Sequence, residues 1–401
     1  MYLSIPKEIC AKIVKCSSGK SLKNMLSNKP KVLFIMHMPP PVHGAAMVGK
    51  YIHDSKIVNE FFDCRFENMM LAKNLEDIGK WGVKKIFNLL SQLKRFKKAI
   101  KESQPDLVYI TPNAAGGAFY KDFVVVQYIK RCLKKYSSNA RIVVHYHNKG
   151  VASRQGKFLD NILYKRFFKG LKVILLANVL YEDVKKYVSK EDVFICPNGI
   201  PESLQGEPVA ERYNEIPKIL FLSNLIVSKG VIVLLDALKI LKDRSVRFTC
   251  DFVGGETDEL NAERFAEEVK RRGLVECAFY AGRKYGSEKA PYFENADVFA
   301  FPTFYHNEAF PLVNIEAMEF KLPIVSTNEG GIPDMVVNGE NGLICERNNV
   351  ESLAAALEKL LLDKNLRLQY GENGYKKFKS EFTLRSFENR IVEILEKSCG
   401  F

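Results

Sequence analysis

Short apolar runs rich in β-branched residues alternate with amphipathic stretches along most of this chain. Strands that are buried on both faces and separated by helices are typical of parallel sheets in doubly wound α/β domains. We expect one set of strands before residue 204 and a second set after it. The first set is Val32–Met36, Leu107–Thr111, Ile142–His147 and Val173–Ala177, and the second is Ile219–Leu222, Phe248–Val253, Val298–Phe301 and Pro323–Ser326.

The length of 401 residues also points to two domains of roughly 200 residues each. The alternating pattern stops in a polar stretch that contains proline, residues 201–217, and starts again near Lys218. We therefore expect one domain at 1–203 and a second at 204–383, with the polar stretch as a hinge. Ligands of such sheets collect at the carboxyl ends of the strands, so a cleft between the domains is the expected site. Helices of the second domain are expected at Val231–Leu241, Glu259–Arg272 and Val350–Leu362.

The composition is that of a globular protein, with 47% hydrophobic and 27% charged residues. No apolar run reaches the ~18 residues that a membrane span needs, and the N-terminal residues lack the pattern of a secretory signal. The nine cysteines are scattered and include no Cys-x-x-Cys pair. Scattered cysteines fit reduced thiols better than disulfides or a zinc site, so we expect a cytoplasmic protein.

Two carboxylates, Glu308 and Glu316, stand eight positions apart in a mostly apolar stretch. A strand ends near Phe301, and a helix is expected to begin near Pro311, because proline is tolerated at a first helical position. The backbone N–H groups of residues 310–313 then form a site for a phosphate or diphosphate. Carboxylates on either side can accept hydrogen bonds from a sugar and a ribose. The structural alternative is that Glu308 only meets the helix dipole and that Glu316 lies on a solvated face.

Several motifs follow one another at fixed places along the chain: Pro197-Asn198-Gly199-Ile200, Ser228-Lys229-Gly230, Phe252-Val253-Gly254-Gly255, the Glu308–Glu316 pair and Gly330-Gly331. In this order they resemble the retaining glycosyltransferases of family 4, in which the glutamate pair is the E-x7-E motif. The resemblance runs from about residue 31 onward and is most specific between residues 195 and 345. It implies the GT-B fold, α/β with two Rossmann-like doubly wound domains facing across a cleft. The first domain would bind the acceptor and the second the donor, and a helix at 384–401 would pack back onto the first.

The resemblance also assigns roles to individual residues. Glu308 matches the glutamate near the donor sugar and the reaction centre, and Glu316 matches the one that binds the ribose. Lys229 matches the lysine that neutralises the donor diphosphate, which is chemically sensible because a cation stabilises a leaving anion; its alternative is a solvated residue before a helix. Contacts with the donor are also expected at the start of the helix, from Phe310, Pro311 and Leu312.

One position departs from the family pattern: Ser223-Asn224 stands where the family usually has Gly-Arg. That arginine assists the lysine on the diphosphate, whereas Asn224 brings no charge. Three explanations are open for the missing arginine. Another basic residue supplies its charge, activity depends more on Lys229, or the donor is held differently. Gly254 is expected near the nucleotide, although turn geometry alone also explains a glycine there.

Candidates in the first domain follow the ends of its strands. The loop after the first strand resembles the family loop that reaches the donor phosphates, which makes Gly44 a donor contact and His43 an acceptor contact. His147 matches the position of a functional histidine near the reacting sugar. His145 shares its strand face and is either an acceptor contact or structural. Asn113, after the next strand, points into the same cleft and is expected to touch the acceptor.

No Asp-x-Asp triplet occurs in the chain, so we expect no metal on the diphosphate and no cofactor. No carboxylate stands out as a covalent nucleophile, and the family expectation is a front-face displacement. The sequence therefore predicts a retaining, metal-independent hexosyltransferase-type enzyme. It would move a sugar from a UDP- or GDP-sugar to an acceptor hydroxyl in bacterial surface polysaccharide or glycolipid synthesis.

Three alternatives stay open at this point. Asn224 motivates a catalytically weak homologue that binds a nucleotide-sugar or a partner enzyme. A basic first half motivates a nucleic-acid-binding protein, which is disfavoured because no aromatic stacking platform accompanies the basic residues. A nicotinamide-dependent enzyme is disfavoured because no Gly-x-Gly-x-x-Gly follows the first strand of either half.

Charge is distributed unevenly. Residues 1–204 carry 35 lysine and arginine against 16 acidic residues, a net charge of +19, whereas residues 205–401 carry −6. The segment Val83–Lys101 combines seven lysine and arginine residues with apolar positions near helical spacing. Either this is a surface helix with a core stripe, or it binds an anionic inner membrane leaflet next to a lipid-linked acceptor. Its apolar positions are Ile86, Leu90, Leu93, Phe96 and Ile100.

Overall fold

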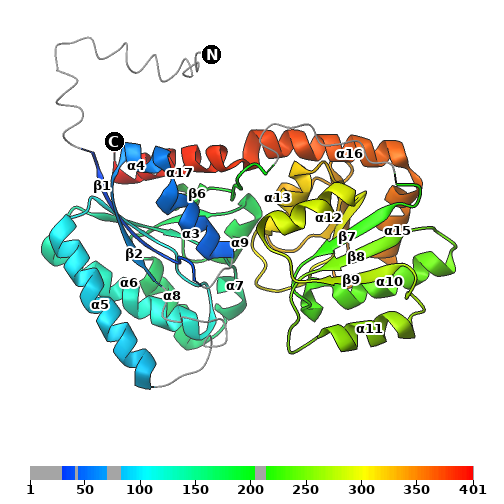
Figure 1. Cartoon of the computed structure of the whole chain (residues 1–401). Coiled ribbons are helices and arrows are strands. Elements are labelled where there is room, and N and C mark those ends of the chain that lie inside the picture. Colours follow the sequence, from blue (N-terminus) through cyan, green and yellow to red (C-terminus); the bar gives the residue numbers. More distant parts are fainter. Residues whose placement is uncertain (1–28, 41–43, 70–82, 204–213, 401) are drawn as a thin grey trace, which may run out of the picture.

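The computed structural model describes residues 29–40, 44–69, 83–203 and 214–400. It contains two six-stranded sheets in which every strand pair is parallel (Figure 1). The first sheet has the order β2-β1-β3-β4-β5-β6. Its strands are β1 (Lys31–Met36), β2 (Asp63–Asn68), β3 (Leu107–Ile110), β4 (Arg141–His145), β5 (Lys172–Leu175) and β6 (Val193–Ile195).

The second sheet has the order β12-β11-β10-β7-β8-β9. In both sheets the chain starts at an inner strand, extends to one edge and then returns to add strands on the other side, and helices cover the faces, so each is a Rossmann-like doubly wound domain. The predicted GT-B class of fold is confirmed. The strands are β7 (Lys218–Leu222), β8 (Thr249–Val253), β9 (Ala278–Gly282), β10 (Val298–Phe301), β11 (Ile324–Thr327) and β12 (Gly342–Cys345).

The eight strands predicted from the sequence are all present, and their ends agree with the prediction to within two residues. The four strands that the pattern did not indicate, β2, β6, β9 and β12, are the edge strands of the two sheets. An edge strand has a neighbour on one side only, and β2, β6 and β9 are largely half-buried. Such strands lack the continuous apolar run that marks a central strand.

The predicted helices of the second domain are also present. Helix α15 (Val350–Leu362) has the predicted bounds, and α10 (Val231–Asp243) extends two residues further. Helix α11 (Ala262–Arg271) begins later than expected, because the Asn261 side chain caps it by accepting a hydrogen bond from Arg264 N–H. The other helices are α3 (Gly44–Asp54), α4 (Lys56–Phe61), α5 (Val83–Ser103), α6 (Gly116–Tyr136), α7 (Val151–Arg154), α8 (Phe158–Phe168), α9 (Tyr181–Val184), α12 (Ala290–Asn295), α13 (Leu312–Glu319), α14 (Ile332–Met335), α16 (Lys364–Lys377) and α17 (Leu384–Cys399).

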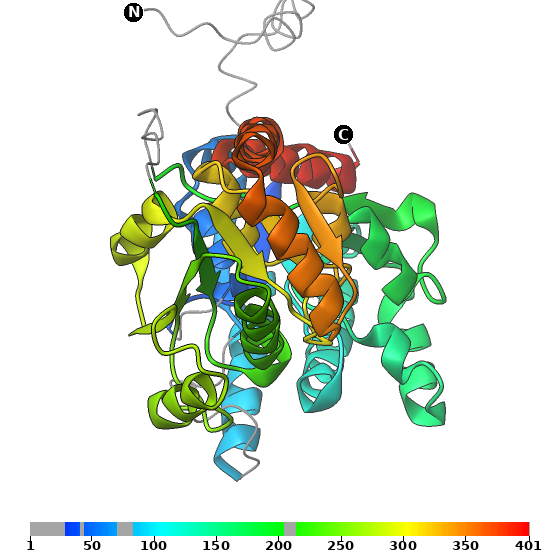
Figure 2. The same cartoon turned by 90° about the vertical axis from the view of Figure 1, so that its right-hand side faces the viewer.

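Helices α16 and α17 run along one side of the molecule, over both domains (Figures 1 and 2). Phe387, Ile391 and Leu395 of α17 are fully buried in a cluster with strand residues of the first sheet such as Phe34 and Tyr109. The second half of the sequence therefore supplies part of the core of the first domain.

The chain crosses between the domains twice, at Ile200 and at Thr383, and the two crossings lie side by side. Ile200 N–H donates to Phe382 O at 3.0 Å, and Leu384 N–H donates to Ile200 O at 2.7 Å. Gly199 is required here, because a Cβ atom would lie 2.4 Å from Thr383 O. The glycine of the Pro-Asn-Gly-Ile motif thus permits the close approach of the crossings.

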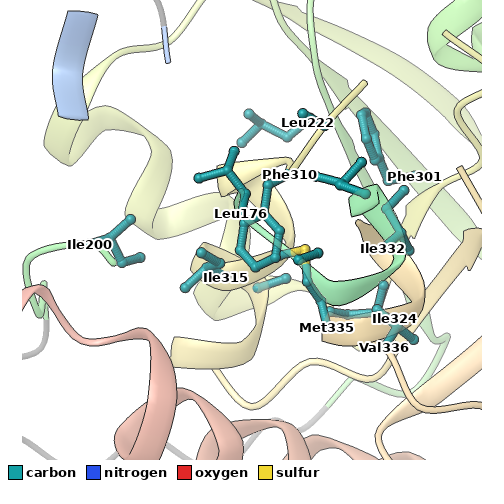
Figure 3. Close-up of a cluster of buried hydrophobic side chains, with 14 of the residues drawn as sticks. Leu176, Ile200, Leu222, Phe301, Phe310, Ile315, Ile324, Ile332, Met335 and Val336 are labelled. Atoms are coloured by element: carbon teal, nitrogen blue, oxygen red, sulfur yellow. The ribbon is translucent and has the colours of Figure 1, made fainter. Parts of the chain in front are cut away.

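The two domains also share buried apolar contacts. Figure 3 shows Leu176 and Ile200, which follow β5 and β6, among side chains of the second domain such as Phe310 and Ile315.

In helix α5, three of the predicted apolar positions are buried, as expected for a surface helix with a core stripe. They are Leu93, Phe96 and Ile100. Among the described residues, no helix is long and apolar enough to cross a membrane.

Candidate active site

A cavity of about 1730 Å³ lies between the two domains. From the first domain, it is lined by His37 and Thr111, which follow β1 and β3. From the second domain, it is lined by Ser223, which follows β7, and by Phe301 at the end of β10. These are the strand pairs at which each sheet reverses its order, so the cavity joins the two switch points where such folds bind ligands.

Lys229 and Glu308 both line this cavity and form an ion pair, with Nζ and Oε2 2.5 Å apart. Glu308 follows β10 and is 8% exposed. The Lys229 ammonium lies 4.6 Å from the ring centroid of Tyr305. Gly230 makes this meeting possible: its φ is +93°, and a Cβ atom there would lie 2.3 Å from Pro302 O. The glycine of Ser-Lys-Gly therefore brings Lys229 against the end of β10.

The Gly330-Gly331 pair lies directly behind Glu308. Gly330 has a φ of +56°, and a Cβ atom there would lie 2.1 Å from Glu308 O. Gly331 N–H donates to Ala309 O at 2.6 Å. The two glycines therefore fix the backbone that carries the glutamate.

Glu316 faces the same cavity from the second turn of α13. It forms an ion pair with Lys289, which ends the short 3₁₀ helix Gly286–Lys289. Its side chain is 21% exposed, and its Oε2 is buried with no hydrogen-bond partner among the described residues. Burial and then the charge of Glu316 raise the pKa of Tyr51, a residue of α3 in the first domain. Glu316 thus lies toward the cleft rather than on a solvated face.

The start of α13 supplies backbone donors to the cavity. Phe310, Pro311 and Leu312 all line it. The helix begins at Leu312, so Pro311 occupies the position before the first helical residue rather than the first position itself. First-turn N–H groups have no partner within a helix and carry the positive end of its dipole. This end of α13 can therefore bind an anion.

Asn224 and Gly254 lie in two loops, after β7 and β8, that pack tightly against each other. Asn224 Oδ1 accepts a hydrogen bond from Gly255 N–H at 3.1 Å. Gly254 has a φ of +156°, and a Cβ atom there would lie 1.8 Å from Ser223 O. Both residues line the cavity. The close packing of the two loops explains why a glycine is needed at position 254. It also places both loops on the cavity wall.

In the first domain, Gly44, Asn113 and His147 line the cavity, whereas His145 does not. His43 lies outside the described residues. His145 is fully buried, with Nδ1 2.6 Å from the Tyr109 hydroxyl, and burial holds its pKa well below the usual range. Its ring lies 4.2 Å from that of His147. Of the two interpretations of His145, the structural one fits this buried position, where its ring packs beside that of His147.

Asn113 is held by other side chains around it. Its N–H and Nδ2 each donate to Asp122 Oδ2 at 2.8 Å, and its Oδ1 accepts from Asn148 Nδ2 at 3.2 Å. The side chain therefore shapes the loop after β3 on the cavity wall.

Among the cavity residues that sequence reasoning did not select are Tyr51, Arg283 and Lys289. None belongs to a local motif. Each reaches the cavity only because segments far apart in sequence are brought together, and no spacing rule would have selected them.

Residues 206–377 match the family model described as Glycosyl transferases group 1. The chain is 29% identical over 205 residues to the capsular polysaccharide biosynthesis glycosyltransferase CapM of Staphylococcus aureus, covering 49% of this chain and 52% of that protein. The chain thus spans about half the length of that relative. It is 25% identical over 353 residues to an uncharacterized glycosyltransferase, MJ1178, of Methanocaldococcus jannaschii, covering 86% and 88%. Among solved structures, Anabaena HepE in complex with UDP and glucose has a TM-score of 0.67 at 16% identity, over 92% of this chain and 99% of that one.

Proposed function

We propose that this chain is a retaining glycosyltransferase of family 4, because residues 206–377 match the glycosyl transferases group 1 family model. It moves a sugar from a nucleotide-sugar to an acceptor hydroxyl. The observation that carries the proposal is the meeting of Lys229, Glu308 and the start of α13 in one interdomain cavity. Residues 1–203 form the acceptor domain in this proposal, and residues 204–383 form the donor domain.

The proposed chemistry is a displacement on one face of the sugar. The bond between the anomeric carbon and the diphosphate oxygen breaks, and the acceptor oxygen bonds to the same face of that carbon. The acceptor proton passes to the leaving phosphate. Lys229 and the N–H groups of α13 stabilise the charge of the leaving diphosphate without a metal, and Glu308 and His147 contact the sugar.

Glu316 is proposed to bind the ribose. Its buried Oε2 has no hydrogen-bond partner among the described residues, so it can accept from a hydroxyl group. The solved complex of HepE with UDP and glucose favours UDP as the nucleotide, and GDP is the second candidate. The CapM relative favours a role in polysaccharide synthesis.

The acceptor is proposed to be lipid-linked and bound at an anionic membrane surface, on its cytoplasmic face. Leu89 of α5 and Val124 of α6 line the first-domain side of the cavity. Beside them, Phe87 and Leu90 of α5 are exposed at 66% and 50%. The same helix carries basic residues, and each one near an anionic surface contributes ~1 kcal/mol. An apolar and basic surface therefore adjoins the acceptor side of the cleft.

A thermal-shift panel of UDP-, GDP- and ADP-sugars tests the donor. A ligand at 100 times its Kd stabilises the folded chain by about 2.7 kcal/mol, so the true nucleotide should raise the Tm while the others do not. Stabilisation by none of them would contradict the proposal. Release of free sugar from the stabilising donor then separates an active enzyme from a weak homologue that only binds.

A further inference from the structure

Five cationic side chains line the interdomain cavity, and three of them are already neutralised. Lys229 pairs with Glu308 and Lys289 pairs with Glu316, both inside the cavity. Lys121 pairs with the buried Asp122 at 2.9 Å. For the remaining two, Arg283 and Lys284, no ion pair with any described residue is present. A diphosphate brings negative charge into this space, so these two residues hold the uncompensated positive charge that can meet it.

Arg283 is the better placed of the two. A Cβ atom on Gly255 would lie 2.6 Å from both Nε and Nη2 of Arg283, so the guanidinium packs directly on the Gly255 backbone. Gly255 N–H in turn donates to Asn224 Oδ1. Asn224, Gly255 and Arg283 are therefore in contact in series, and the charge of Arg283 lies beside the turn that Asn224 occupies.

We propose that Arg283 binds the donor diphosphate and supplies the positive charge that Asn224 lacks. Asn224 acts as a positioning residue that holds the Gly255 turn against which the guanidinium packs. A guanidinium is suited to this because its fork of N–H groups matches phosphate oxygens. This inference rests on the proposed function, since it names a further residue of the same donor site.

Calorimetric titration of the full chain with UDP and GDP, and with uridine and guanosine, tests the proposal. Arg283→Gln should weaken binding of the preferred nucleoside diphosphate about tenfold or more, because a hydrogen bond to a charged group is lost. Binding of the matching nucleoside should stay unchanged, and Arg283→Lys should retain part of the affinity. The control is Arg264→Gln, which removes the same charge from α11, outside this cavity.

Equal affinity of wild type and Arg283→Gln for the diphosphate would overturn the inference while leaving the proposed function intact. An equal loss of nucleoside and diphosphate binding would also overturn it, because it would place Arg283 on the base. Failure of the wild type to bind either diphosphate would instead contradict the proposed function itself. Because Arg283 is exposed, its substitution does not disturb the core.

Discussion

Lys149 and Glu329 form an ion pair that joins the two domains beside the cavity. Lys149 follows β4 of the first domain, and Glu329 follows β11 of the second. Glu329 is 2% exposed and also pairs with Arg347 at 2.9 Å. Asn178 N–H donates to Asp334 Oδ2 on the same interface, at 2.5 Å. Polar contacts thus join the domains at residues that are far in sequence from the first crossing at Ile200.

Glu329→Gln should destabilise the protein in a pH-dependent way. Burial raises the pKa of Glu329, but the hydrogen bonds and charges of Lys149 and Arg347 outweigh it and hold the pKa below its usual value. The ionised carboxylate therefore stabilises the fold above its unfolded pKa of ~4.3, and this is lost as the pH falls through the folded pKa.

At pH 7 we expect Glu329→Gln to cost about 1–3 kcal/mol of unfolding free energy. The difference from wild type should shrink as the pH is lowered below about 4. Denaturant titrations across pH measure this, with the exposed Glu340→Gln as the control. A difference that stays constant with pH would exclude the ion pair as its source.

The two glutamates of the cavity should affect different kinetic constants. Glu316→Ala should mainly raise KM for the donor, because a ribose contact is equally strong in the ground state and the transition state. Glu308→Ala should mainly lower kcat, because its carboxylate lies beside Lys229 near the proposed reaction centre. Steady-state kinetics of both variants decide this. If both raise KM alone, the assigned roles are wrong.

Lys229→Ala should lower kcat on the order of 10²-fold or more, comparable to the loss of one oxyanion donor. Turnover of the donor measures the effect. Lys239→Ala is a suitable control, since that lysine pairs with Asp243 on the exposed face of α10. Near-full turnover by Lys229→Ala would mean that the diphosphate binds elsewhere.

Binding to anionic vesicles should depend on the exposed apolar residues of α5. The double substitution Phe87→Ser and Leu90→Ser should reduce co-sedimentation with anionic vesicles several-fold, since ~25 cal/mol of burial energy per Å² of apolar surface is removed. Wild-type binding should weaken at high salt. Leu362→Ser, at a position 71% exposed in the second domain, is the control. Binding that is insensitive to both salt and the double substitution would contradict membrane docking through α5.

The central strands were predictable because both of their faces are buried, which leaves a continuous apolar run in the sequence. Edge strands such as β2 leave no such run, since one side of the strand has no neighbour. Lys229, Glu308 and Glu316 could be selected from the sequence because they belong to local motifs with fixed spacing, and the structure shows that glycines at 230 and 330 allow the tight backbone contacts beside Lys229 and Glu308. The partner of Glu316 was not found, because Lys289 belongs to a polar turn that gains meaning only when the helices pack.

Because α17 covers one face of the first sheet with Phe387, Ile391 and Leu395, the first domain has an incomplete core while the chain is being synthesised. The residues that close it emerge only after the strands of the second domain have left the ribosome. The first domain therefore completes its core after the strands of the second domain have been synthesised, and until then the first sheet presents an apolar face that a chaperone can recognise.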